Sequence, residues 1–238
     1  MHASCCVTSS AFRVPAVADA VTLVTKVWFD DMGYEPALAA ARRSMQNLGC
    51  DRVDVLLIHF PGSVDAVQSP AKNRRLRADT WRALERLHAD GHATRIGVSN
   101  WTRRHLRETL SSCTIAPQVL QTELHPRLQQ QELVEDARAA NMALMAFCPL
   151  AHGSPALLAN PALQRIANVR EDGATPAQLA LRWSIDRGFI PIPKASSPSR
   201  LAENLRAVNL APLTPEELSA LDALEANDRY SFDPRLIA

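Results

Sequence analysis

The chain has 238 residues, of which 47% are hydrophobic and 21% are charged, which is the composition of an ordinary globular protein. A formal net charge of +1 excludes a broad basic surface, so neither nucleic acid nor a membrane is an expected partner. The longest apolar runs, such as Val53 to Ile58, fall far short of the roughly 20 residues that a membrane-spanning helix needs. We therefore expect a soluble protein.

Cysteine usage is typical of a reducing compartment, so a cytoplasmic location is expected. The five cysteines are odd in number and lack C-x-x-C spacing, which predicts neither a disulfide framework nor a metal site. They are Cys5, Cys6, Cys50, Cys113 and Cys148. Residues 1–10 lack the features of a secretory signal, and we interpret residues 1–13 as a disordered or atypical lead-in to a single domain over 14–238.

Short apolar runs alternate with longer amphipathic stretches along the chain. The six predicted strands are Val21 to Thr25, Val53 to Ile58, Arg95 to Val98, Val119 to Thr122, Ala143 to Phe147 and Phe189 to Ile192. The predicted crossover helices are Glu35 to Leu48, Asp79 to Asp90, Thr102 to Ser111, Gln130 to Asn141 and Pro176 to Arg187. This alternation is typical of an α/β protein with a parallel sheet.

Capping residues mark the helix starts in the last third of the chain. Thr175 precedes Pro176, and Thr214 precedes Pro215 with Glu217 in the position that completes a capping box. The arginine-rich runs at 74–77 and 103–104 are interpreted as solvated faces. Helices are therefore expected to begin at both prolines.

Six consecutive βα units suggest a (β/α)8 TIM-type barrel that lacks its first two βα units. Such a barrel closes with eight strands over typically ~250 residues. The 20 residues before Val21 are too few for two such units. Because an unclosed barrel exposes an unpaired strand edge, we expect either self-association through that open edge or poor stability.

Polar residues end several predicted strands, which is where a βα barrel places its active site. No G-x-G-x-x-G, P-loop or G-x-S-x-G motif occurs in the chain. Only three of the 26 basic residues are lysines, yet Lys26 and Lys194 both follow predicted strands. This suggests that an ammonium group is required there, with chance placement as the alternative. His59 also ends a strand, and a satisfied core histidine is its alternative interpretation.

Five ordered motifs resemble the aldo-keto reductase family from about Val14 onwards. They are Thr25-Lys26-Val27-Trp28, Leu57-Ile58-His59-Phe60-Pro61, Ile96-Gly97-Val98-Ser99-Asn100-Trp101, Gln121-Thr122-Glu123-Leu124-His125-Pro126, and Ile192-Pro193-Lys194 followed by Arg200 and Glu203-Asn204. The resemblance implies NADPH-dependent carbonyl reduction, with small carbonyl compounds as substrates. It also implies a catalytic tetrad of Asp, Tyr, Lys and His, of which Lys26 and His59 match the last two members.

The aspartate and tyrosine of that tetrad belong to the part of the family pattern that this chain lacks. Tyr34 and Tyr230 are its only tyrosines, and neither occupies the motif. Loss of general acid catalysis costs ~10² to 10⁴ in rate. A cofactor-binding pseudoenzyme or a truncated gene product is therefore the alternative function, and a true start upstream of Met1 is a third possibility.

The resemblance also implies a nearly complete NADPH site. Ser99, Asn100 and Gln121 resemble the trio that binds the carboxamide, and Phe147 matches the ring that stacks on nicotinamide, with core packing as the alternative. Lys194 and Arg200 resemble the pair that grips the 2′-phosphate. The remaining expected cofactor-binding residues are Cys148, Leu150, Ser196, Glu203 and Asn204.

Two tryptophans, Trp28 and Trp101, are expected to line the substrate pocket as apolar walls, with surface-cluster packing as the alternative for each. The stretches Leu150-Ala151-His152-Gly153 and Ala226-Asn227-Asp228-Arg229 resemble bacterial 2,5-diketo-D-gluconate reductase-type members. That resemblance implies a small aldehyde or ketone as substrate, without identifying it.

Overall fold

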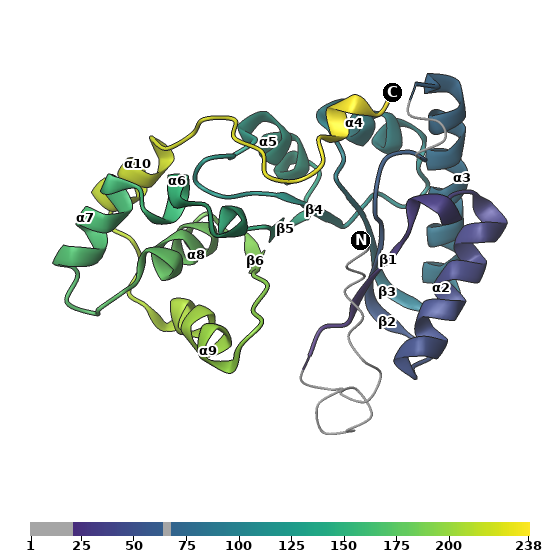
Figure 1. Ribbon diagram of the computed structural model, residues 1–238. Helices are drawn as coiled ribbons and strands as arrows, with labels where there is room; N and C mark the ends of the chain where they lie inside the picture. The colour runs from purple at the N-terminus through teal and green to yellow at the C-terminus, as the bar shows by residue number, and fades with distance from the viewer. Residues whose placement is uncertain (1–20, 64–67) are drawn as a thin grey trace. The chain divides into compact units, whose positions relative to one another are not determined.

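The computed structural model describes residues 21–63 and 68–238, and Figure 1 shows its helices and strands. The predicted lead-in, residues 1–13, lies outside the described residues. The chain forms two compact units. Unit 1 runs to Val119 and includes Arg235–Ala238, whereas unit 2 comprises Leu120–Pro234.

Unit 1 contains parallel strands with helices in the connections between them. Its elements in chain order are β1 (Val24–Val27), η1 (Phe29–Asp31), α2 (Tyr34–Leu48), β2 (Val53–Ile58), α3 (Pro70–Ala89), β3 (Ala93–Ser99) and α4 (Arg103–Ser112). The short helix η5 (Pro234–Leu236) begins the C-terminal segment that belongs to this unit. Strand β2 is parallel to both β1 and β3. The core of the unit includes the fully buried side chains of Leu57, Leu84 and Ile96.

Two glycines of unit 1 show why this sequence folds locally as it does. Gly49 ends α2 in the left-handed conformation, with φ +68°, and its N–H bonds the Gln46 carbonyl. Gly97 lies within β3, where a Cβ would come within 2.3 Å of the Val119 carbonyl oxygen. Only glycine fits that close backbone approach.

Unit 2 continues the alternation of strands and helices. Its elements are β4 (Val119–Glu123), α5 (Gln131–Ala139), β5 (Ala143–Phe147), η3 (Ala151–Gly153), α6 (Pro155–Leu158), α7 (Pro161–Val169), α8 (Pro176–Asp186), β6 (Ile190–Ile192), α9 (Pro198–Arg206), η4 (Ala207–Asn209) and α10 (Pro215–Asp222). Strands β5 and β6 are parallel, with Phe147 opposite Ile192. Thr175 and Thr214 cap α8 and α10 as predicted.

The described strands follow one another in chain order, β1-β2-β3-β4-β5-β6. All six predicted strands are present, although β1 lies two to three residues further along the chain than predicted. Helix α3 begins at Pro70 rather than Asp79, and α6 and α7 had not been predicted. The arginine run at 74–77 is not a wholly solvated face, because Arg77 is only 3% exposed.

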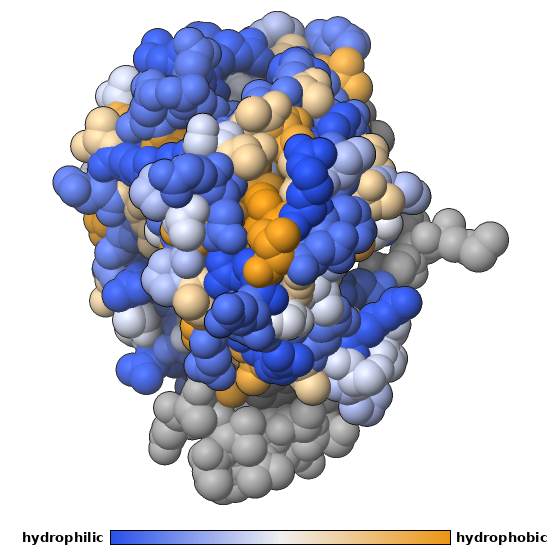
Figure 2. All heavy atoms as spheres, turned by 90° about the vertical axis from the view of Figure 1, so that its left-hand side faces the viewer, coloured by the Kyte–Doolittle hydropathy of each residue, from blue (hydrophilic) through white to orange (hydrophobic). Residues whose placement is uncertain are grey.

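Hydrophilic side chains predominate on the face of unit 2 that Figure 2 presents, around a short apolar strip. The exposed large apolar side chains of the unit include those of Val169, Ile190, Leu201, Leu205 and Val208. Three of these lie on α9 and η4 at positions i, i+4 and i+7, so they share one helical face. This face of α9 is not part of the core of unit 2.

Candidate active site

Lys26 and His59 lie at the carboxyl ends of neighbouring parallel strands in unit 1. In the register of β1 with β2, Lys26 is opposite Leu57 and Val27 is opposite Ile58. The His59 N–H then donates to the Val27 carbonyl over 3.0 Å, which extends the ladder by one residue. The two predicted catalytic residues are therefore brought to one edge of the same pair of strands.

The His59 imidazole lies among aromatic rings. Its centroid is 4.6 Å from the Trp28 ring in an edge-on arrangement and 4.8 Å from the Phe60 ring, on which it stacks. Burial, with a smaller contribution from the positive charge of Lys26, lowers the pKa of His59 to about 4. His59 is consequently a neutral imidazole at pH 7, able to donate one hydrogen bond and accept another.

Ser99 and Asn100 are buried where β3 ends, next to the His59 segment. The Asn100 side-chain amide donates to the His59 carbonyl over 2.9 Å and also contacts Ser99 Oγ at 3.2 Å. Asn100 adopts a left-handed backbone conformation, with φ +62°, which asparagine tolerates better than most residues. The structure thus brings Ser99, Asn100, His59 and Lys26 together in unit 1.

The two predicted pocket tryptophans differ in exposure. Trp28 is 39% exposed and contacts the rings of Phe29 and Phe60 as well as His59. Trp101 is 1% exposed, and its indole N–H donates to Thr109 Oγ1 over 3.1 Å. Trp101 therefore belongs to the core beside α4, whereas Trp28 presents apolar surface at the carboxyl end of β1.

Two predicted cofactor residues lie on β4 and β5 in unit 2, and a third follows β5. Gln121 is buried, and its amide nitrogen lies 3.8 Å from the sulfur of Met145. Phe147 is half-buried at the end of β5, where its carbonyl accepts from Leu124 N–H. Cys148 follows in the left-handed conformation, and burial with the nearby Glu123 charge raises its pKa to about 11. Its thiol is therefore protonated at pH 7.

Exposed cationic side chains flank the beginning of α9. Lys194 follows β6, and Arg200 lies in the first turn of the nine-residue helix, which Ser197 caps by accepting from the Arg200 N–H. Both cations and Ser196 are exposed, as a phosphate-binding site requires. Backbone N–H groups at a helix start and a nearby guanidinium fit a phosphate group well.

Glu203 and Asn204, in the middle of α9, are only partly exposed. The Glu203 carboxylate accepts from Thr175 Oγ1 over 2.8 Å, and its carbonyl accepts from the Gln178 amide over 2.8 Å. These contacts join α9 to the start of α8, so Glu203 also positions the helix. Asn204 is half-buried beside it, and Leu150 is half-buried in the segment after β5.

Both tyrosines have partners of their own. The guanidinium of Arg82 lies over the Tyr34 ring, 5.3 Å from its centroid, at the start of α2. The Tyr230 hydroxyl donates to the Asp228 carboxylate over 3.0 Å in unit 2. These contacts give no reason to assign either tyrosine as a proton donor.

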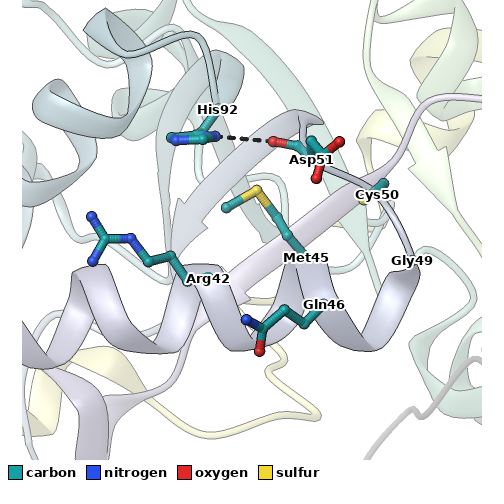
Figure 3. A pocket seen from close by; sticks show the side chains of 7 residues that line it. All are labelled: Arg42, Met45, Gln46, Gly49, Cys50, Asp51 and His92. Atoms are coloured by element: carbon teal, nitrogen blue, oxygen red, sulfur yellow. Dashed lines mark hydrogen bonds between the residues drawn. The ribbon is translucent and has the colours of Figure 1, made fainter.

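An open pocket of about 340 Å³ lies at the other end of the strands of unit 1 (Figure 3). Its lining residues are Arg42, Met45, Gln46, Gly49, Cys50, Asp51 and His92. They come from the end of α2 and from the residues that precede β2 and β3. Active sites of βα folds lie at the carboxyl ends of strands, so this pocket is not the candidate active site.

Two further properties of the described residues bear on function. Within residues 21–63 and 68–238, no group of three or more His, Cys, Asp or Glu side chains could hold a metal ion. None of the described helices is long and apolar enough to cross a membrane.

Comparison with known proteins agrees with this arrangement. The family model "Aldo/keto reductase family" matches residues 11–226. The 9,11-endoperoxide prostaglandin H2 reductase of Trypanosoma cruzi is 40% identical over 90% of this chain and 71% of its own length. The glyoxal reductase of Bacillus subtilis is 38% identical over 89% of this chain and 71% of its own. The solved structure of a Gox0644 variant in complex with NADPH matches with a TM-score of 0.81 and 33% identity, covering 90% of this chain and 74% of that chain.

The fold and these similarities define an α/β protein of the TIM-barrel class, with six strands that match aldo/keto reductase structures over about three quarters of their length. The chain belongs to the aldo/keto reductase family. The predictions of fold class and family are therefore confirmed. The family is one of oxidoreductases, which reduce carbonyl groups with NADPH.

Proposed function

We propose that this chain reduces a small aldehyde or ketone with NADPH, in the manner of 2,5-diketo-D-gluconate reductase-like members of its family. The observation that carries the proposal is the pairing of Lys26 and His59 at the carboxyl ends of adjacent strands. Trp28 adds an apolar wall beside them, which suits a small organic substrate. Glyoxal is a sensible first substrate because the Bacillus subtilis relative is named a glyoxal reductase.

The proposed chemistry of the protein residues follows from their charge states. His59, with its pKa lowered to about 4, presents a neutral N–H that can donate to a carbonyl oxygen. The Lys26 ammonium adds positive potential where negative charge develops on that oxygen during reduction. Lys26 lies on β1 and the His59 backbone is hydrogen-bonded to the same strand, so their orientation is largely set before substrate binds.

The residues of the proposed cofactor site fit NADPH in chemical type. Hydroxyl and amide groups of Ser99, Asn100 and Gln121 suit a carboxamide, and the half-buried Phe147 suits a flat ring. Lys194 and Arg200 suit the 2′-phosphate that distinguishes NADPH from NADH, and Ser196 adds a hydroxyl. The remaining proposed contacts are Cys148, Leu150, Glu203 and Asn204. NADPH supplies the hydride when bound.

Carbonyl-dependent oxidation of NADPH by the purified chain tests the proposed activity. Lys26→Met should lower kcat/KM for glyoxal at least about 100-fold, because it removes positive charge beside the reacting oxygen. Lys72→Met is the matched control, since Lys72 is an exposed lysine on α3. Equal rates in wild type and Lys26→Met would reject the proposal.

A second candidate function, binding of the cofactor without turnover, is favoured by the separate partners of Tyr34 and Tyr230. With no tyrosine assigned as proton donor, the final protonation step has no identified acid. Saturable NADPH binding with no carbonyl-dependent oxidation would support this pseudoenzyme. Absence of both binding and a cooperative melt would instead support a truncated gene product.

Cofactor choice gives an independent test at α9. Arg200→Leu should weaken NADPH binding about 10- to 100-fold and leave NADH binding nearly unchanged, because only NADPH carries the 2′-phosphate. Arg206→Leu, in the last turn of the same helix, is the control. Fluorescence titration of both variants with both nucleotides measures the ratio of the Kd for NADPH to the Kd for NADH. An equal loss for the two nucleotides would contradict the assignment.

Self-association is a further part of the proposal. Ile190 and Ile192 of β6 are both at least 36% exposed, and β5 is the hydrogen-bonded neighbour of that strand within the described residues. These features support pairing between copies through β6.

A cytoplasmic location is also part of the proposal, and it is supported by the family and by the cysteine pattern.

A further inference from the structure

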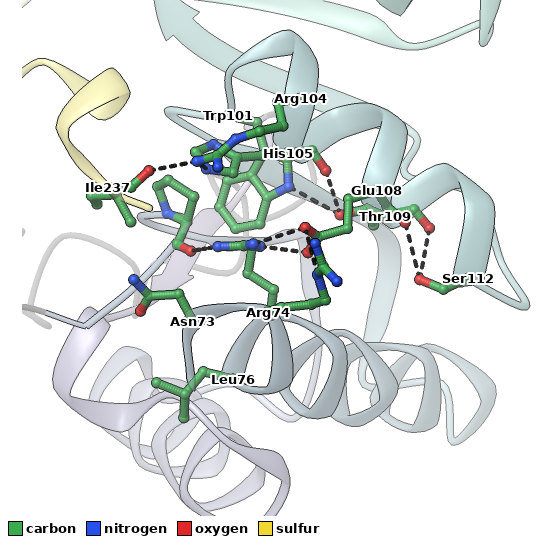
Figure 4. A network of polar contacts seen from close by, with 12 residues as sticks. Asn73, Arg74, Leu76, Trp101, Arg104, His105, Glu108, Thr109, Ser112 and Ile237 are labelled. Atoms are coloured by element: carbon green, nitrogen blue, oxygen red, sulfur yellow. Dashed lines mark hydrogen bonds and ion pairs between the residues drawn. The ribbon is translucent and has the colours of Figure 1, made fainter. Parts of the chain in front are cut away.

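Residues 235–238 return to unit 1 and pack beside the loop that carries His59. Ile237 is only 3% exposed, and its carbonyl accepts from Arg104 Nη2 over 2.8 Å, as Figure 4 shows. Leu236, its neighbour, is 59% exposed. One buried side chain and two backbone oxygens of the tail thus contact the rest of unit 1.

Two polar side chains of α3 connect this tail to the loop after β2. Arg77 Nη1 donates to the Pro61 carbonyl over 2.8 Å and to the Ala238 backbone oxygen over 3.3 Å. Asn73 donates to the same Ala238 oxygen over 3.2 Å and accepts from the Ser63 N–H over 3.3 Å. Each of these side chains therefore bridges the tail and the loop.

The loop and the tail are also in direct van der Waals contact. A Cβ on Gly62 would lie 2.6 Å from Ile237 Cγ2 and 2.6 Å from Asn73 Oδ1, so the glycine lies directly against both side chains. Gly62 is three residues beyond His59, and Pro61 and Phe60 lie between them. Movement of Ile237 would therefore change the space available to a short, constrained segment.

The network is built from groups that are costly to bury. Asn73 is fully buried and Arg77 is 3% exposed. The Arg77 guanidinium is paired with the Glu108 carboxylate at 2.8 and 2.9 Å. Well-packed apolar residues often stabilise a core as well as a buried ion pair does, whereas polar networks fix one geometry. Precise placement of the loop is a consequence of such a network.

We propose that Ile237 is a positioning residue that fixes the orientation of the His59 imidazole by packing against Gly62 while Asn73 and Arg77 join the tail to the loop. Its relevance to catalysis rests on the proposed carbonyl reduction, in which His59 contacts the substrate. The geometric part of the proposal, that the tail determines the position of His59, is independent of turnover.

Proton NMR of the His59 ring in the full chain tests the geometric part directly. The stacked Phe60 ring and the edge-on Trp28 ring shift the His59 resonances by their ring currents. Ile237→Ala should move these resonances at pH 7 towards ordinary histidine values and raise the pKa of His59 by about half a unit or more, because water gains access. Leu236→Ala should change neither the His59 resonances nor the pKa of His59. The signals that disappear in His59→Gln are thereby assigned to His59.

A loss of stability alone would not shift the His59 resonances, because a folded variant with an undisturbed loop would keep the wild-type values. Unchanged His59 resonances and pKa in folded Ile237→Ala would overturn the proposal. If that variant does not fold, Ile237→Leu decides the question, because leucine keeps the side-chain volume but lacks the Cγ2 methyl that lies against Gly62, so a smaller shift in the same direction is expected. Wild-type shifts in Ile237→Leu would then reject it.

Turnover gives a second readout that separates this proposal from the proposed function. If wild type reduces glyoxal, Ile237→Ala should lower kcat about 10-fold or more and leave the KM for NADPH within about twofold. Lowered affinity for NADPH at unchanged kcat would contradict the proposal. If wild type shows no turnover, the proposed function fails while the NMR result still tests the tail.

Discussion

At the scale of single residues, the two most strongly perturbed histidines belong to different networks of unit 1. His59 is neutral because it is buried among aromatic rings with Lys26 nearby. Burial, followed by the charges of Arg77 and Arg104, lowers the pKa of His105 to about 3. His105 is fully buried in the first turn of α4, where its ring bonds Thr102 at the cap. Both imidazoles therefore resist protonation in the folded state.

This resistance predicts a loss of stability in mild acid. An unfolded histidine has a pKa of about 6.5, above the folded values, so the unfolded chain binds more protons below that pH. Stability should therefore be unaffected above about pH 7 and fall as the pH drops from about 6.5 towards 4. Each histidine contributes up to about 1.4 kcal/mol per pH unit in that window.

Denaturant unfolding at pH 7.5, 6 and 5 measures this slope, since most carboxyl groups remain ionised down to pH 5. His105→Gln is the informative variant, because glutamine completes a capping box at the same position and does not titrate. We expect it to reduce the pH slope by about half. A slope equal to that of wild type would show that His105 is not responsible.

Sequence patterns predicted some of these residues and not others. Lys26, His59, Ser99 and Asn100 could be predicted because each stands where a strand ends, and the structure brings these four together. The burial of Arg77 could not, because arginine-rich runs usually lie in solvent and its partners, Pro61 and Ala238, are distant in the sequence. A long-range contact of this kind leaves no local signal.

At the scale of elements, helix starts explain both the correct predictions and the errors. Thr175 and Thr214 predict the starts of α8 and α10, and the structure confirms both caps. The start of α3 was missed because Ser69 makes no side-chain cap and an arginine-rich first half conceals the apolar face. Helices α6 and α7 were missed although Ser154 and Asn160 each cap a helix that begins at Pro, the same signal that marks α8 and α10. The four residues of α6 are too few to show an amphipathic pattern.

The Thr175 hydroxyl has two roles, which predicts an unequal effect of removing two similar caps. Thr175→Ala removes the α8 cap and the hydrogen bond to Glu203 that joins α9, whereas Thr214→Ala removes a cap and a hydrogen bond to the exposed Glu216 carboxylate of the same helix. We expect losses of about 2 kcal/mol and about 1 kcal/mol respectively. Thermal unfolding should show the larger decrease in Tm for Thr175→Ala. Equal decreases would mean that the Glu203 contact adds nothing.

At the scale of the whole molecule, the alternation of strands and helices was sufficient to predict the fold class. Near-continuous apolar strands and amphipathic crossovers have few other arrangements, and the structure has the strands in chain order. The division into two compact units was not predicted, because no change in composition marks Val119 or Arg235. Which side chains line a substrate pocket also depends on packing, as the buried Trp101 shows.

Exposure of β6 gives a prediction about assembly. If copies pair through this strand, light scattering of wild type should give a mass above the 26.1 kDa of one chain. Ile190→Lys places a charge on the strand and should return the protein to a single chain. Val169→Lys, at a side chain that is 78% exposed at the end of α7, is the control. A folded wild-type monomer would contradict pairing through β6.

The return of residues 235–238 to unit 1 has a consequence for biosynthesis. Asn73 and Ala238, which share a hydrogen bond, are 165 positions apart, so the ribosome must make all of unit 2 between them. At typical elongation rates this delay is on the order of 10 s. During that interval the nascent unit 1 lacks the segment that covers Gly62, so the surface that Ile237 later fills is accessible to a chaperone. Translation speed through unit 2 should therefore influence the yield of folded protein.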